Sequence, residues 1–168
     1  MIKPAALYKE EIVVRTYDLW YNPKYQYLFG AYMWNIDFNT DTSNKRQFVV
    51  LDEDDEPIGY FHYNIQAATH SIESVIAYTF GNDNRKLYFI KEVIKELKRC
   101  ILEENFDRIE WFAYDNNPAA RGYKNLSEKY GGGIVAHFHK NANLSDNTLH
   151  DVIYYEILKE NIPEKYKK

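Results

Sequence analysis

The first third of the chain carries an alternation of hydrophobic and polar positions that predicts strands separated by a helical segment. Glu11–Tyr17 is rich in β-branched residues, which favours a first strand. Asn22-Pro23 is typical of a helix start, and apolar residues recur at helical spacing from Tyr25 to Ile36. The polar segment Asp37–Arg46 is rich in turn formers and predicts a surface loop.

The middle of the chain predicts a meander followed by a crossover. Strands are expected at Gln47–Leu51, Ile58–Ile65 and Ser74–Phe80. The acidic stretch between the first two strands indicates a solvated turn, because it lacks the glycine and distal glutamate of a calcium loop. Arg85–Leu102 has one apolar stripe and one charged face, which predicts a long helix. The strand Arg108–Tyr114 follows, and a strand–helix–strand unit places its two strands in parallel.

The last third predicts a helix and a closing hairpin. Asn117-Pro118 begins the helix, and the run Gly131–Gly133 ends it by supplying the left-handed residue of a C-cap. Ile134–His139 and Leu149–Leu158 are the two expected strands of the hairpin. Residues 1–168 therefore form one α/β (α+β) domain, with a mixed, mostly antiparallel sheet, a central parallel pair and flanking helices.

Composition excludes several classes of protein. The formal net charge of −4 argues against nonspecific nucleic-acid binding, which needs a basic face. Cys100 is the single cysteine, so an internal disulfide is excluded, and its place in an apolar helical stripe predicts a buried, unreactive thiol. No segment has the length of a membrane span or a signal peptide, so we expect a cytoplasmic protein that does not bind membranes. The 16 tyrosines fit a β-rich core, with an interaction surface as the alternative.

The order of these elements resembles that of the GNAT N-acetyltransferase superfamily over nearly the whole chain. The sharpest local likeness is WFAYDNNPAARGYKNLSEKYGGGIVAHFH followed by DVIYYEIL. The resemblance implies an acyl-CoA-dependent N-acetyltransferase that transfers acetyl from acetyl-CoA, as cosubstrate, to an amine of unknown identity. The acceptor would be a small molecule or a peptide, and a homodimer is left open.

The resemblance also implies where the cosubstrate would lie. The pantetheine arm would enter a wedge between the two parallel strands, where a backbone amide between Ala77 and Thr79 would polarise the thioester carbonyl. The residues implied on the cosubstrate side come from the wedge, the loop after it and the start of the next helix. They are Ala77, Tyr78, Thr79, Phe80, Asn82, Asn84, Arg85, Lys86, Asn117 and Ala120. A helix cap alone would also account for Asn117.

Three residues are implied for proton transfer. Tyr123 follows Asn117 at close to the family's spacing and is the favoured general acid. The helix is about one turn longer than usual, so Tyr130 competes for this role. Glu73 lies where some family members place a carboxylate base, although many members use a water chain. Packing alone would also explain both tyrosines.

The segment from Phe80 to Lys86 departs from the family pattern. The family's pyrophosphate loop has several glycines, which let backbone amides close around phosphates at a helix start. This chain keeps one glycine and adds Asp83, so the alternative is a non-catalytic GNAT-fold binding protein that has lost the cofactor loop. His137 and His139 share one strand face near His150-Asp151, but surface histidines are commoner than metal ligands, so no metal site is predicted.

Overall fold

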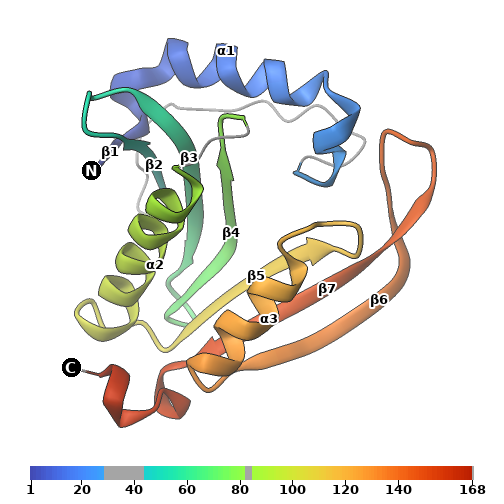
Figure 1. Ribbon diagram of the computed structural model, residues 1–168. Coiled ribbons are helices and arrows are strands. Elements are labelled where there is room, and N and C mark those ends of the chain that lie inside the picture. The colour runs from blue at the N-terminus through green and yellow to red at the C-terminus, as the bar shows by residue number, and fades with distance from the viewer. Residues whose placement is uncertain (29–43, 82–84, 168) are drawn as a thin grey trace.

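The protein forms a seven-stranded mixed sheet with helices on both faces (Figure 1). The computed structural model describes residues 1–28, 44–81 and 85–167. The strand order is β1-β2-β3-β4-β5-β7-β6. The strands are β1 (Ile2–Pro4), β2 (Lys45–Leu51), β3 (Pro57–Gln66), β4 (Ser71–Thr79), β5 (Arg108–Tyr114), β6 (Gly133–Asn143) and β7 (Leu149–Leu158). All neighbours pair antiparallel except β4 and β5, which confirms the predicted fold class and its parallel pair.

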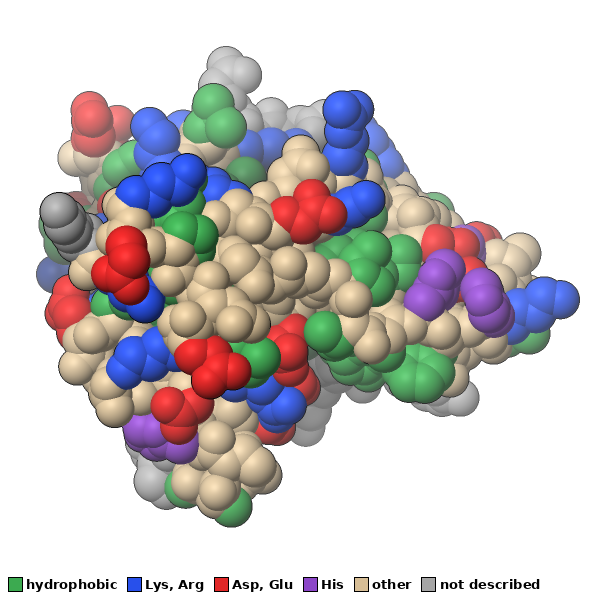
Figure 2. All heavy atoms as spheres, turned by 90° about the horizontal axis from the view of Figure 1, so that it is seen from below, with side chains coloured by type: hydrophobic (Ala, Val, Ile, Leu, Met, Phe, Trp, Pro, Cys, Tyr) green, Lys and Arg blue, Asp and Glu red, His purple; other side chains and the backbone are tan. Residues whose placement is uncertain are grey.

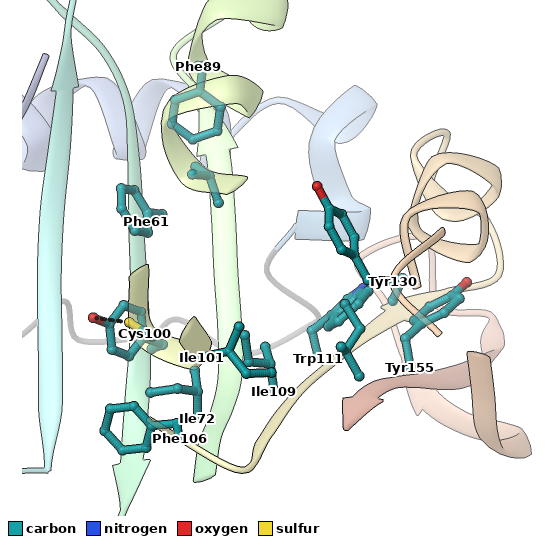
Figure 3. Close-up of a cluster of buried hydrophobic side chains, with 14 of the residues drawn as sticks. Phe61, Ile72, Phe89, Cys100, Ile101, Phe106, Ile109, Trp111, Tyr130 and Tyr155 are labelled. Atoms are coloured by element: carbon teal, nitrogen blue, oxygen red, sulfur yellow. Dashed lines mark hydrogen bonds between the residues drawn. The ribbon is translucent and has the colours of Figure 1, made fainter. Parts of the chain in front are cut away.

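Two hydrophobic clusters hold the helices to opposite faces of the sheet. Helix α1 (Lys9–Trp20) packs with Val49, Tyr60 and Tyr78 on one face. Helices α2 (Lys86–Leu102) and α3 (Ala120–Lys129) pack on the other face, where Trp111 and Tyr155 belong to the larger cluster (Figure 3). Short 3₁₀ segments complete the elements: η1 (Ala5–Tyr8), η2 (Pro23–Leu28), η3 (Lys159–Asn161) and η4 (Glu164–Tyr166). In the described residues, no helix is both long and apolar enough to span a bilayer.

The first predicted strand is wrong, because Glu11–Tyr17 lies inside α1. The prediction for Tyr25–Ile36 is also wrong at its start, where the structure has the 3₁₀ segment η2 in place of an α-helix. The rest of that segment, from residue 29, and the predicted loop up to residue 43 lie outside the described residues. The short edge strand β1 was not predicted, and β6 is longer than the predicted Ile134–His139.

A β-bulge in β4 determines the shape of the centre of the sheet. His62 pairs with Ile76 and Asn64 pairs with Glu73, so β4 has one residue more than β3 between these two pairs. Ser74 takes up the extra length with a left-handed φ of 53°. Because a bulge bends its strand, β4 turns away from β5 beyond this point. The parallel ladder is accordingly limited to Ser71–Arg108 and Ile72–Ile109, and the two strands then diverge (Figure 1).

The C-terminal hairpin of β6 and β7 projects from the body of the protein (Figures 1 and 2). β6 is the outer strand of the sheet and exposes Ile134, Val135 and Phe138. The run of glycines before it ends α3 as predicted, with Gly131 in the left-handed conformation at φ 81°. Gly131 therefore supplies the C-cap, and the hairpin begins two residues later.

Candidate active site

A cavity of about 390 Å³ lies where β4 and β5 diverge. β4 contributes Val75, Ala77 and Thr79, and β5 contributes Ile109 and Trp111. The remaining walls come from the apolar face of α2, the start of α3 and the 3₁₀ segment η2. They include Tyr25, Tyr27, Phe89, Ile90, Val93, Ile94, Leu97, Asn117, Ala119, Tyr123 and Leu126. The lining is mostly apolar, as expected of a site that encloses a flexible organic chain.

The edge of β4 supplies free backbone groups to this cavity. On the β3 side, the Phe80 N–H donates to the Ile58 carbonyl at 2.9 Å. Successive backbone groups of a strand point to opposite sides, so the amides of Ala77 and Thr79 point toward β5. β5 pairs only with Ser71 and Ile72 of β4, so within the described residues these two amides have no strand partner. The amides of Ala77 and Thr79, two of the positions expected to hold the oxyanion donor, therefore face the cavity, whereas the Tyr78 amide faces β3.

Tyr123 on α3 lies at the cavity with its ring against two other aromatic rings. Its ring centroid is 6.4 Å from that of Trp111 and 6.0 Å from that of Tyr155. Burial, together with the neighbouring Tyr27 and Tyr155, raises the pKa of Tyr123 to about 12, against the lowering effect of a hydrogen bond with the Asn117 side chain. A phenol with this pKa stays protonated at neutral pH and is available as a proton donor.

Asn117 connects the start of α3 to this tyrosine. Its side chain is buried, and its Oδ1 accepts a hydrogen bond from the Ala119 N–H at 2.8 Å. This bond forms an Asx turn directly before the helix. The same side chain lies near Tyr123 and lowers the pKa of its phenol. The prediction that Asn117 caps the helix is wrong, because α3 begins at Ala120 with Ala119 as its N-cap, and Asn117 forms the turn before it and lines the cavity. Ala120, the first residue of α3, accepts a hydrogen bond from the Tyr155 hydroxyl through its carbonyl at 3.3 Å.

The other two residues predicted for proton transfer lie in different surroundings. Tyr130 borders the cavity at the far end of α3, where its ring packs 5.0 Å from that of Tyr166. Glu73 lies at the paired end of β4 and is not among the residues that line the cavity. Its Oε1 accepts hydrogen bonds from Arg108 Nη2 at 2.9 Å and from Ser71 Oγ at 2.8 Å. The structure thus brings Tyr123 and Ala77 to the same cavity and leaves Glu73 in an ion pair outside it.

The predicted cofactor loop is described only in part. Asn82 and Asn84 lie outside the described residues, and Gly81 before them has a left-handed φ of 98°. Arg85 forms an ion pair with Asp52, and Lys86 begins α2 and lines the cavity. Tyr78 and Phe80 direct their rings to the other face of the sheet. There the Tyr78 hydroxyl lies 3.0 Å from Thr16 Oγ1, and the two rings pack on each other.

Sequence reasoning missed Trp111 and the tyrosines of η2 as parts of this site. Trp111 is 6% exposed and lines the cavity, and its Nε1 is buried without a hydrogen-bond partner in the described part of the chain. Alternation along β5 was the available signal, because it places Ile109, Trp111 and Ala113 on the buried face. Tyr25 and Tyr27 gave no comparable signal, because they reach the cavity only through the way the 3₁₀ segment η2 packs in the folded protein.

Known proteins match this chain in fold and not in sequence. No family model matches the sequence, and no curated protein matches it significantly. Solved structures do match. A mutant of spermidine N-acetyltransferase SpeG from Vibrio cholerae aligns over 99% of this chain and 96% of its own, with a TM-score of 0.68 and 18% identity. A SpeG chimera from Vibrio cholerae and hSSAT aligns over 74% and 70%, with a TM-score of 0.60 and 22% identity.

The chain therefore has the fold of the GNAT acetyltransferases, as the sequence resemblance implied. A third neighbour, SpeG from Vibrio cholerae in complex with manganese ions, aligns over 95% of this chain and 92% of its own, with a TM-score of 0.65 and 16% identity. At these identities the likeness is one of fold, so the activity has to be argued from the residues of the site.

Proposed function

We propose that this protein is an acyl-CoA-dependent N-acetyltransferase that transfers the acetyl group of acetyl-CoA to an amine. The observation that carries the proposal is the cavity between the diverging strands β4 and β5, which has a protonated Tyr123 in its wall. The fold shared with N-acetyltransferases supports the same reaction class. A cytoplasmic location stays a prediction, and a homodimer and the identity of the amine stay open.

The site residues would divide the reaction between them. The amides of Ala77 and Thr79 would donate hydrogen bonds to the thioester oxygen, on which negative charge develops as the amine attacks the carbonyl carbon. The C–N bond forms and the C–S bond then breaks. Tyr123 would donate its proton to the departing thiolate. The attacking nitrogen loses its proton to water, because Glu73 lies outside the cavity in an ion pair with Arg108.

Trp111 offers a further donor to a bound acyl-CoA. A buried N–H without a partner is costly, and a carbonyl in the cavity would satisfy it. The amide carbonyls of a pantetheine arm have the required acceptor chemistry. We therefore expect Trp111→Phe to weaken acetyl-CoA binding while the fold is retained.

Binding is the first test. Excess acetyl-CoA should raise the melting temperature of the full-length protein, because a ligand that binds only the folded state stabilises it. Isothermal calorimetry should show one site per chain. No heat and no shift at about millimolar acetyl-CoA would reject the enzyme and favour the non-catalytic binding protein.

Turnover with a panel of amines is the second test. Replacing Tyr123 with Phe should lower kcat by about 10²- to 10⁴-fold, the usual range for general acid catalysis, and leave acetyl-CoA affinity nearly unchanged. Tyr130→Phe is the matched control, because it also removes one tyrosine hydroxyl, at the C-cap of α3. If the Tyr130 variant loses turnover and the Tyr123 variant does not, the acid is Tyr130.

A further inference from the structure

Three side chains with metal-ligating atoms converge on the outer surface of the projecting hairpin, away from the cavity. His137 Nε2 and His139 Nδ1 each lie 2.8 Å from Asp151 Oδ2. All three ligand atoms lie within 4.8 Å of one another. The two imidazole rings are 4.4 Å apart between centroids. None of the three residues lines the cavity.

The backbone of β6 builds this arrangement. His137 and His139 are two residues apart on one strand, so their side chains share a face, and Asp151 on β7 presents its side chain to both. The register shifts between Phe138 and Ala142, and Lys140 within this bulge has a left-handed φ of 50°. The bulge turns the Lys140 N–H toward Asp151, whose Oδ1 accepts its hydrogen bond at 2.9 Å. The backbone thus holds Asp151 Oδ1 in place, and Asp151 Oδ2 contacts the two imidazoles.

We propose that His137, His139 and Asp151 bind a divalent transition-metal ion of borderline character, with Zn²⁺ as its representative. Two imidazole nitrogens and one carboxylate oxygen are a donor set that suits zinc, whereas Mg²⁺ and Ca²⁺ prefer oxygen ligands throughout. Tetrahedral zinc holds such atoms about 3.3 Å apart, so each nitrogen would move about half an ångström from the carboxylate oxygen, and the two nitrogens, which lie within 4.8 Å of one another, would adjust to the same spacing.

The exposure of the site fits reversible binding from solution. The His137 and His139 side chains are 45% and 77% exposed, so both rings can adjust, and the remaining coordination positions face solvent. A bound ion would join β6 to β7 across the bulge at Lys140 and would stabilise the hairpin. Since the cluster lies outside the cavity, this proposal is independent of the acetyltransferase proposal.

The binding experiment uses the full-length, tag-free protein after treatment with a chelator. Titration with Zn²⁺ should show one ion per chain, and Co²⁺ should give a visible absorption band of four- or five-coordinate geometry. His139→Gln and Asp151→Asn should each lower Zn²⁺ affinity by more than about tenfold. His70→Gln is the matched control, because His70 pairs with a single carboxylate, that of Asp107, at 3.2 Å and should leave binding unchanged.

Thermal melting gives a second readout. Zn²⁺ should raise the melting temperature of the wild type and of His70→Gln but not of the two ligand variants, and Mg²⁺ and Ca²⁺ should have no such effect. The proposal is overturned if the wild type binds no Zn²⁺. It is equally overturned if His139→Gln and Asp151→Asn, folded by circular dichroism, bind Zn²⁺ as tightly as the wild type.

Discussion

Gly132 lies so close to β7 that a methyl group has no room there, which makes Gly132→Ala a sharp test of the packing between the end of α3 and the sheet. A Cβ at this position would lie 1.8 Å from the Glu156 carbonyl oxygen and 2.8 Å from its carbon. Both neighbours are backbone atoms, so either α3 or β7 must move by more than an ångström. Overpacking of a well-packed site costs about 1–3 kcal/mol and occasionally more, and we expect about 3 kcal/mol here.

Gly133 provides the matched control for this substitution. A Cβ at Gly133 meets no atom within 4 Å, so Gly133→Ala should change the free energy of unfolding by less than about 0.5 kcal/mol. For a chain of this size, 3 kcal/mol corresponds to a melting temperature lowered by about 6–12 °C in Gly132→Ala. Urea and thermal denaturation followed by circular dichroism would measure both variants. Equal stabilities of the two would refute the close approach of Gly132 to Glu156.

Three further predictions concern titration and buried hydrogen bonds. Because the pKa of Tyr123 is raised to about 12, kcat should show no alkaline decline from this residue below about pH 11, and a decline at lower pH that Tyr123→Phe abolishes would contradict the raised pKa. Hydrogen bonds to two aspartates raise the pKa of His150 against the opposing effect of burial. Protonated His150 therefore stabilises the folded state fully at pH values below its pKa in the unfolded chain, and this stabilisation is lost as the pH rises through its pKa in the folded protein. His150→Gln should thus lower the free energy of unfolding more at about pH 5.5 than at about pH 8.5. Tyr63→Phe removes the buried hydrogen bond to Glu96 at 2.8 Å and should cost about 1.5–3 kcal/mol by urea denaturation, whereas an unchanged midpoint would show that this bond adds nothing.

The error at α1 shows how tertiary packing overrides local propensity. A strand would place Ile12, Val14 and Thr16 on one face, yet Ile12 and Thr16 are buried while Val14 is 61% exposed. The buried set, completed by Leu19, follows the spacing of a helix. β-Branched residues lower helix propensity only slightly, and burial against the sheet outweighs that cost.

The second half of the chain was easier to predict because its signals are local. The turn at Asn117 precedes α3, the glycine run at Gly131–Gly133 follows it, and alternation defines β5. By contrast, no glycine or proline marks the bulge at Ser74, although this bulge opens the cavity. The width of the wedge depends on how far β4 and β5 stay paired, and that is a property of the assembled sheet.

The acyl arm and the phosphates of acetyl-CoA place different requirements on the chain. Sequence reasoning made the glycine-poor segment after Phe80 decisive for cosubstrate binding, because it bears on the phosphates. The free edge of β4 at Ala77 and Thr79, the Trp111 N–H and the Tyr123 hydroxyl all lie along the cavity instead. In the proposed reaction these groups would serve the acyl arm, whereas the glycine-poor segment would serve the phosphates. A weakened phosphate contact would therefore lower affinity for acetyl-CoA without removing the groups that the proposed reaction needs.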